Sequence, residues 1–407
     1  MTFETDSTTL KARYAATLAQ DAYRLKNDIL RRTVLFERKD EFDIRESEEL
    51  DIYGRKELYI NNGEQLNGQT GALIFVKTAH IMGMCAFGIG EYAGQAFIIL
   101  KGTASLFDGL TDLNSGIKRC DTGGQVHQGF QDTFETFRPQ LIKFQSKLAK
   151  RTEIHTIHCI GHSLGGALAT LTADWLSANC EITVKLYTFG SPRVGLTYFA
   201  NNFTNSINPE NIFRVHHKTD PVPMLPTWPF IHVPDKGTDY LLDSGLHPWK
   251  YHFMDNYLSS VSANGEVSLD WPTLKAKRPP ALMDKSIENW LKSDGPLSLS
   301  INTVQVLNSA LLWVIQKIVN ISGIMLVGAT TTTFTILDRL AYMMHKAYDF
   351  SKELGFWVMR LITRMARILG IVMTETTSFT VAFIRMIFIR IHHGVSELVR
   401  KASQAIE

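Results

Sequence analysis

The stretch Gly161-His162-Ser163-Leu164-Gly165-Gly166 decides the fold of this chain. It has the spacing Gly-x-Ser-x-Gly, which places a serine on a sharp turn between a strand and a helix. Residues 154–160 before it favour a buried strand. Residues 167–179 after it favour a helix with Leu168, Leu171, Trp175 and Ala178 on one face. Because such a turn leaves no room for Cβ atoms, glycines flank the serine. The stretch predicts a nucleophilic Ser163, and the alternative is a glycine-rich turn with an ordinary serine.

Strands and helices are expected to alternate around this turn. A helix is expected over residues 8–30, and a second one over much of 132–151, where Pro139 should break or restart it. Residues 31–70 are charged and are expected to be irregular. The alternation from about residue 94 to 217 predicts an α/β sheet. The strands of this part of the chain are expected at residues 73–77, 82–87, 96–100, 182–189 and 212–216.

A serine hydroxyl needs a base to take its proton, and the base is usually a histidine that a carboxylate orients. In α/β-hydrolases these groups follow in the order Ser, Asp or Glu, His. Asp220 fits the acid because it follows the strand-like residues 212–217, and Pro221 fixes the chain directly after it. The alternative for Asp220 is a carboxylate that only caps a turn.

Three downstream histidines are candidates for the base: His252, His247 and His232, in that order of preference. His252 lies in an aromatic segment, residues 249–258, that is expected to pack beside the turn. Its alternative is a hydrogen-bonded packing histidine. His162 directly precedes Ser163, so its side chain should point away from the nucleophile and be structural.

The oxyanion of the reaction needs hydrogen-bond donors that are already in place. One is expected to be the backbone N–H of Leu164. The second should come from the loop after the apolar strand Phe97–Leu100, where Thr103 offers both an N–H and a hydroxyl. The alternative there is an ordinary turn at the end of a strand.

Five sequence stretches together resemble class 3 (fungal-type) lipases over about residues 10–260. The resemblance implies an α/β-hydrolase-like mixed sheet with flanking helices and hydrolysis of carboxylic esters of lipids. It also implies the triad Ser163, Asp220 and His252, with Thr103 and Leu164 forming the oxyanion hole. One departure is Lys101, where the family usually has arginine. The five stretches are Leu100-Lys101-Gly102-Thr103, Val126-His127-Gln128-Gly129-Phe130, Gly161–Gly166, Tyr187–Gly195 and Asp220-Pro221-Val222-Pro223.

The family also carries a lid after the oxyanion loop. Residues 104–113 occupy that place here, and Leu106, Phe107, Leu110 and Leu113 would form the apolar face of such a lid. An ordinary surface helix packed on the core is the alternative.

The last third of the chain differs in composition from the rest. We expect a lipase-like domain over residues 1–277, a linker with one short helix over 278–301, and an all-α region over 302–407 that lacks proline. This region holds 11 Lys and Arg against 6 Asp and Glu. Residues 318–337 carry no charge and are about long enough to span a bilayer.

A polar stripe repeats every seven residues in the following segment. It comprises Arg339, Lys346, Glu353, Arg360 and Arg367, and predicts one helix of nearly thirty residues with apolar residues opposite. Basic residues also interrupt the apolar piece 379–391. Three arrangements stay open: contact with a membrane interface, a membrane span, or a soluble helical bundle.

The remaining composition narrows the chemistry. A net charge of +2 gives no reason to expect a nucleic acid partner, and Cys85, Cys120, Cys159 and Cys180 lack metal-ligand spacing. Free thiols are expected there, with a disulfide as the alternative. No metal or organic cofactor is expected. The acidic start, Met1–Asp6, does not resemble a secretory signal, so we expect a cytoplasmic or membrane-associated protein, or export by a signal-independent route.

The sequence thus predicts a serine lipase or phospholipase that acts through an acyl-enzyme. Its expected partners are a lipid or phospholipid substrate, a membrane surface and, as a further hypothesis, an inhibitor or delivery protein. The narrowest hypothesis is an antibacterial lipase effector that needs no signal peptide. The alternative is a membrane-binding or membrane-permeabilising protein whose C-terminal helices carry the main activity.

Overall fold

The structure is a computed structural model. It describes residues 8–24, 46–50, 56–58, 64–70, 78–88, 90–102, 116–226, 229–234, 239–244, 248–264, 267–277, 283–324, 336–374 and 377–403.

A seven-stranded mixed sheet forms the centre of the α/β part, in the order β11-β10-β9-β8-β5-β4-β3. From β5 to β11 the neighbouring strands run parallel, and β3, β4 and β5 pair antiparallel. Every residue of β5 and β8 is buried, as expected for strands covered on both faces. The strands are β3 (Glu64–Thr70), β4 (Thr78–Phe87), β5 (Gln95–Leu100), β8 (Thr156–His162), β9 (Thr183–Phe189), β10 (Ile212–His217) and β11 (Tyr240–Leu242).

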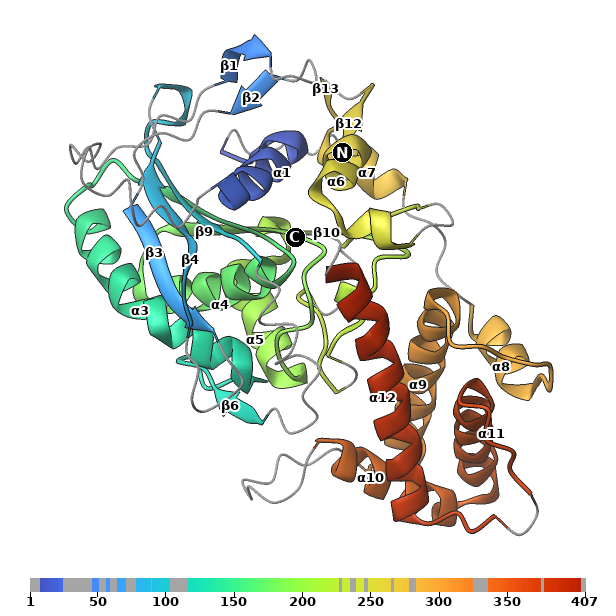
Figure 1. Cartoon of the computed structure of the whole chain (residues 1–407). Helices are drawn as coiled ribbons and strands as arrows, with labels where there is room; N and C mark the ends of the chain where they lie inside the picture. The colour runs from blue at the N-terminus through green and yellow to red at the C-terminus, as the bar shows by residue number, and fades with distance from the viewer. Residues whose placement is uncertain are drawn as a thin grey trace.

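Helices cover both faces of this sheet (Figure 1). On one face lie α3 (Gln128–Leu148), α4 (Leu164–Asn179) and α5 (Thr197–Ile207); on the other lie α1 (Ala12–Asp21), α6 (Met254–Ser260) and α7 (Trp271–Ala276). The predicted α/β-hydrolase-like sheet with flanking helices is confirmed. The short elements are β1 (Glu46–Leu50), β2 (Lys56–Leu58), β6 (Ile117–Arg119), β7 (Gln125–His127), β12 (Ser262–Ala263), β13 (Val267–Ser268), and the 3-10 turns η1 (Ala22–Arg24), η2 (Gly90–Tyr92), η3 (Pro209–Asn211), η4 (Val222–Met224) and η5 (Pro248–His252).

Strand β3 corrects the expectation that residues 31–70 are irregular. Its sequence, Glu-Gln-Leu-Asn-Gly-Gln-Thr, lacks the apolar alternation of a typical strand because it lies at the edge of the sheet. Leu66 alone supplies a large buried apolar side chain there. The strand expected at 73–77 lies outside the described residues.

Helix α3 corrects the expectation that Pro139 interrupts it. The helix runs from Gln128 to Leu148 with Pro139 inside. A proline within a helix costs about 3 kcal/mol, whereas burying one large apolar side chain contributes about 1.5–3 kcal/mol. The continuous buried face outweighs the cost of the proline; it consists of Phe130, Phe134, Phe137, Leu141, Phe144 and Leu148.

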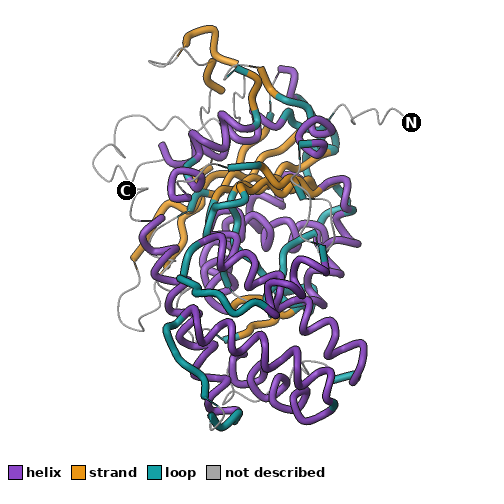
Figure 2. Tube along the Cα trace, turned by 90° about the vertical axis from the view of Figure 1, so that its right-hand side faces the viewer, coloured by secondary structure: helices purple, strands orange, loops and turns teal. Residues whose placement is uncertain are grey.

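The C-terminal region is helical, as predicted, and packs as a bundle against the α/β part (Figures 1 and 2). Its helices are α9 (Ile301–Ser322), α10 (Ile336–Phe350), α11 (Lys352–Ile368) and α12 (Val381–Ser403), and α8 (Asp284–Lys292) precedes them in the expected linker. One continuous apolar cluster includes residues of the bundle and of the sheet's α3–α4 side. Among the described residues, α9 is the one helix long and apolar enough to cross a membrane, and 44% of its most apolar window is buried.

The helices of this region differ in detail from the expected pattern. Within the uncharged residues 318–337, α9 ends at Ser322, and Gly323 takes the left-handed conformation with φ +67°. The nearly thirty-residue helix is divided into α10 and α11, because the Ser351 side chain accepts a hydrogen bond from the Leu354 N–H and caps α11.

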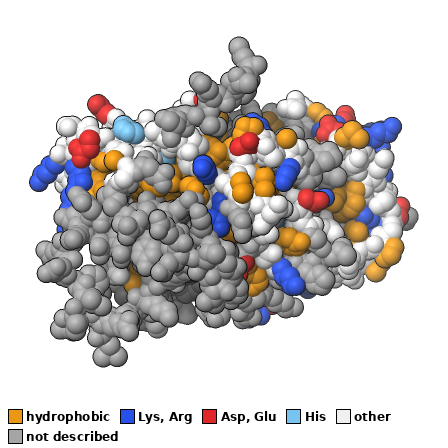
Figure 3. Space-filling view, turned by 90° about the horizontal axis from the view of Figure 1, so that it is seen from above, with side chains coloured by type: hydrophobic (Ala, Val, Ile, Leu, Met, Phe, Trp, Pro, Cys, Tyr) orange, Lys and Arg blue, Asp and Glu red, His pale blue; other side chains and the backbone are white. Residues whose placement is uncertain are grey.

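The basic stripe of α11 packs on the segment before the bundle. Arg360 and Arg367 both form ion pairs with Asp294. Arg364 is buried and donates to the carbonyls of Ser293 and Gly295. These three cations therefore attach α11 to the residues that link α8 to α9. On the face seen from above, acidic and basic side chains are interspersed among apolar ones (Figure 3).

Candidate active site

The turn between β8 and α4 has the strained backbone that the Gly-x-Ser-x-Gly spacing predicts. Ser163 has φ +55° and ψ −130°, and α4 begins at the next residue. A Cβ atom at Gly161 would lie 2.2 Å from the Gly165 carbonyl oxygen, and one at Gly165 would lie 2.2 Å from the Leu100 carbonyl oxygen. Only glycine fits these two positions, so the sequence fixes Ser163 at the tip of the turn.

The structure brings Ser163, His252 and Asp220 into one hydrogen-bonded chain. The Ser163 hydroxyl donates to His252 Nε2 at 3.0 Å. The Nδ1–H of His252 donates to the Asp220 carboxylate, 3.0 Å from Oδ1 and 2.9 Å from Oδ2. Asp220 follows β10, and His252 ends η5. The three side chains are at most 1% exposed, which protects the chain of hydrogen bonds from water.

The other candidate histidines lie elsewhere. His232 is bonded through Nε2 to the Pro223 carbonyl at 2.8 Å. His247 lies outside the described residues. Of the two ranked histidines that the structure describes, the one preferred from sequence is the one that contacts Ser163.

Two groups that sequence reasoning did not single out hold the acid. The Tyr257 hydroxyl donates to Asp220 Oδ2 at 2.6 Å, and the Val222 N–H donates to Oδ1 at 2.9 Å. Burial, and next the negative charge of Asp220, raise the pKa of Tyr257 well above its usual value, so the phenol stays a donor. Gly190 makes room for this arrangement, since a Cβ atom there would lie 2.6 Å from Asp220 Oδ2.

His162 joins the backbones around the nucleophile. Its Nε2 contacts the His252 carbonyl at 2.8 Å, and its Nδ1 contacts the Tyr23 hydroxyl at 2.7 Å. The same hydroxyl accepts from the Gly102 N–H at 3.1 Å. Burial, and next the charge of His252, lower the pKa of His162 well below its usual value. His162 thus connects the histidine loop, the N-terminal η1 turn and the end of β5, which is a structural arrangement.

Comparison with known proteins finds a matching family model for part of the chain. Residues 97–230 match the family model described as Lipase (class 3). These matched residues are referred to below as the class 3 lipase region. The class 3 lipase region contains both Ser163 and Asp220, whereas His252 lies 22 residues beyond its end.

Individual relatives cover part of the chain. The chain is 34% identical over 166 residues to the secreted mono- and diacylglycerol lipase 1 of Fusarium solani, covering 39% of this chain and 49% of that protein. It is 32% identical over 130 residues to phospholipase A1-II 1 of Oryza sativa subsp. indica, covering 28% and 32%. The solved triacylglyceride lipase of Rhizomucor miehei aligns with a TM-score of 0.38 and 23% identity over 57% of this chain and 78% of that chain. The chain therefore spans about half the length of the first relative.

The oxyanion side of the class 3 lipase region is described in part. Leu164 is the first residue of α4, so no carbonyl within the helix can accept its N–H, which is available to a reacting carbonyl. Thr103 lies outside the described residues, and so do the expected lid residues Leu106, Phe107, Leu110 and Leu113. Within the described ranges, no group of three or more His, Cys, Asp or Glu is arranged to hold a metal ion.

Buried neutral histidines make the stability of the class 3 lipase region depend on pH. Burial, and next the charge of His392, lower the pKa of His127 from 6.5 to about 3, whereas the unfolded chain keeps the usual value. The unfolded state therefore binds more protons below pH 6.5, and stability is lost as the pH falls from there toward 3. The His127 contribution between pH 7 and pH 5 is about 2 kcal/mol.

The variant His127→Phe isolates this effect. Phenylalanine suits the site because the His127 ring lies 4.7 Å from the Phe130 ring and 5.5 Å from the Phe230 ring. Urea unfolding at pH 7 and pH 5 should show a loss of stability that is smaller by about 2 kcal/mol in the variant. The exposed His155, changed to Gln, serves as the control. Equal pH dependence of wild type and His127→Phe would contradict this prediction.

Proposed function

We propose that this protein is a serine carboxylester hydrolase that acts on lipids, a lipase or phospholipase. The observation that supports this most strongly is the unbroken chain of hydrogen bonds from Ser163 through His252 to Asp220, in which Ser163 and Asp220 lie within the class 3 lipase region. A hydroxyl polarised by a histidine that a buried carboxylate orients is the group that attacks an ester carbonyl.

In this proposal Ser163 attacks the acyl carbon while His252 takes its proton. Asp220 keeps the Nδ1 proton on His252 and stabilises the imidazolium. The Leu164 N–H and Thr103 stabilise the oxyanion, and His252 then returns the proton to the leaving alcohol. Water then attacks the acyl-enzyme. His252 takes a proton from this water and returns it to the Ser163 oxygen as the fatty acid leaves. No step requires a metal or an organic cofactor.

A phospholipid membrane is the proposed substrate surface. The bundle exposes large apolar side chains near the junction of α10 and α11: Tyr342 is 55%, Phe350 53% and Phe356 40% exposed. Lys346 Nζ lies 5.5 Å from the centre of the Tyr342 ring. Aromatic side chains beside a cation suit the interface between lipid headgroups and acyl chains. The names of the relatives, which include both acylglycerol lipases and a phospholipase A1, agree with an ester of either class.

The test is fatty-acid release by the purified full-length chain from phosphatidylcholine vesicles and from triacylglycerol emulsions. We expect release from vesicles at the higher rate. Equal rates on the two substrates would contradict the phospholipid preference, and release from neither would contradict the function.

The alternative of a membrane-permeabilising protein and the narrower hypothesis of an antibacterial effector each have their own test. Leakage of vesicles caused equally by wild type and Ser163→Ala would favour a membrane-permeabilising protein over a hydrolase. An antibacterial effector should slow bacterial growth when the wild type is directed to the periplasm, and Ser163→Ala should not. Unimpaired growth with wild type would contradict that hypothesis.

A further inference from the structure

The C-terminal bundle packs on the two loops that carry the acid and the histidine of the triad. Helix α9 contacts η4, which begins two residues after Asp220. Helix α12 contacts η5, whose last residue is His252. Figure 1 shows the C-terminal end of α12 directed at the α/β part. The bundle is therefore attached to the catalytic side of the sheet.

A cavity of about 40 Å³ lies in the seam between η4 and the bundle. Met224 supplies the wall from the lipase region, and side chains of α9 and α12, with others from α10 and α11, supply the rest. Most of the lining is apolar, including Leu307, Leu311, Phe388 and Ile391, and its polar members are Asn308 and His392. A space with this lining favours a hydrocarbon chain over a polar headgroup.

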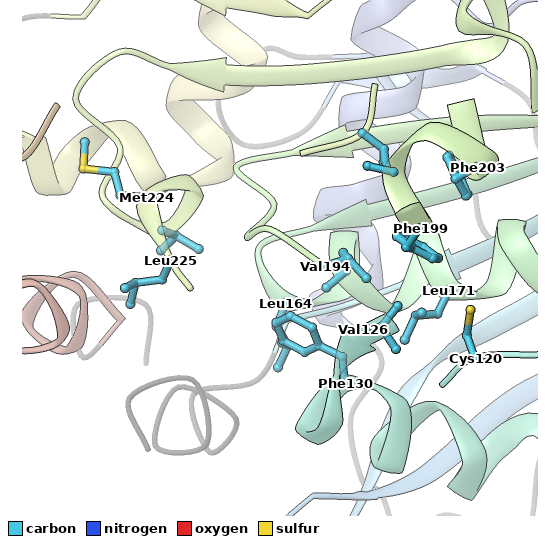
Figure 4. Packing of buried hydrophobic residues seen from close by; sticks show 14 of the residues in the cluster. Cys120, Val126, Phe130, Leu164, Leu171, Val194, Phe199, Phe203, Met224 and Leu225 are labelled. Carbon is cyan, nitrogen blue, oxygen red and sulfur yellow. The ribbon is translucent and has the colours of Figure 1, made fainter. Parts of the chain in front are cut away.

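Apolar side chains connect this seam to the nucleophile. Leu164, the residue after Ser163, belongs to the same buried apolar cluster as Val222, Met224 and Leu225 and as the bundle helices. In the close view Leu225 lies between Met224 and Leu164 (Figure 4). The apolar core beside Ser163 is therefore the same core that contains the seam between η4 and the bundle.

Some buried polar groups near the seam lack the hydrogen-bond partners that a permanent core would provide. His127 interacts electrostatically with His392 of the cavity lining, and neither ring nitrogen of His127 has a hydrogen-bond partner among the described residues, although its side chain is only 1% exposed. The Ser396 hydroxyl of α12, 5% exposed, also lacks one within the described part of the chain. Buried polar groups without partners and an empty apolar volume both make the closed seam unfavourable relative to a packed core.

The triad is closed in this conformation, since Ser163 and Asp220 are 1% and His252 0% exposed. An ester can reach the Ser163 hydroxyl only if a neighbouring part of the structure moves. We propose that the acyl chain of the substrate binds in the seam between Met224 and helices α9 and α12, so that the C-terminal bundle forms one wall of the acyl-binding site. This inference rests on the proposed lipid-ester hydrolysis and assigns the bundle a role in chain-length selection.

The cavity holds only the last methylenes of a chain, so a longer chain must separate the helices from η4. The side chain of Leu307 controls the available space from α9. Leu307→Trp fills the seam and should lower the ratio of kcat/KM for p-nitrophenyl palmitate over p-nitrophenyl butyrate at least about tenfold. Leu307→Ala enlarges the seam and should raise this ratio several-fold. The same helix provides the matched control Gln316→Trp at an exposed position, where the ratio should not change.

Both esters are presented in the same detergent micelles to the full-length protein, and thermal melting verifies that each variant is folded. If Leu307→Trp does not fold, the opposite shift expected for Leu307→Ala decides the question. A ratio within twofold of wild type in the folded Leu307 variants would overturn the acyl site and leave the hydrolase intact. Failure of the wild type to hydrolyse either ester would overturn the proposed function as well.

Discussion

Replacement of Ser163 by alanine is expected to lower kcat for ester hydrolysis by about 10⁶-fold, with little change in lipid binding. The variant removes only the hydroxyl that donates to His252 Nε2, so no acyl-enzyme can form. Because the side chain is 1% exposed and alanine is smaller, the turn between β8 and α4 should keep its shape. The measurement is fatty-acid release from phospholipid vesicles, together with vesicle co-sedimentation.

Ser191 provides the matched control. It is another buried serine in the turn after a central strand, and its hydroxyl donates to the Pro192 carbonyl and not to a triad residue. Ser191→Ala should retain kcat within a few-fold. If Ser163→Ala kept more than about one hundredth of the wild-type rate, a different nucleophile would have to carry the reaction.

Asp220→Asn is expected to lower kcat by about 10⁴-fold at neutral pH while the fold persists. The amide has nearly the same size as the carboxylate. Its NH₂ group, however, can face His252 Nδ1 as a donor, in the position where a carboxylate oxygen now accepts the Nδ1–H. His252 would then carry its proton on Nε2, where it cannot take the serine proton. The kcat of the variant, measured from pH 6 to pH 10, should stay far below wild type throughout.

Asp174 is the appropriate control for a buried carboxyl group. It is 2% exposed, accepts from the Thr122 hydroxyl and lies on α4 away from the triad. Asp174→Asn should leave kcat within a few-fold of wild type. A similar loss of activity in both variants would mean that Asp220 contributes to folding and not to the orientation of His252.

Local spacing explains why the nucleophile and the acid could be found from sequence. Gly161 and Gly165 are required by contacts within six residues of Ser163 or with the end of the adjacent strand. The short motif itself therefore contains the residues that force the turn. Asp220 followed by Pro221 similarly marks the end of a strand. The choice of His252 over His247 and His232 depended on aromatic neighbours, because the fold alone decides which distant loop reaches the nucleophile.

Contacts between distant residues explain what the sequence did not reveal. Tyr257 bonds to Asp220 across 37 positions and Tyr23 to His162 across 139, and neither pair leaves a periodic pattern. In the bundle, heptad spacing predicted helix correctly but not the break at Ser351, because a serine is compatible with both a helix interior and a cap. The sequence pattern favoured a solvated or membrane-facing stripe at Arg360 and Arg367, whereas both side chains form ion pairs with Asp294.

Covalent labelling tests the identity of the nucleophile most directly. The full-length protein would be treated with a small fluorophosphonate, which phosphonylates an activated serine, and the modified residue located by peptide mass spectrometry. We expect one adduct per chain at Ser163, none in Ser163→Ala and much slower labelling in Asp220→Asn. An adduct at another residue, or an unlabelled Ser163 in protein that hydrolyses esters, would contradict this assignment of the nucleophile.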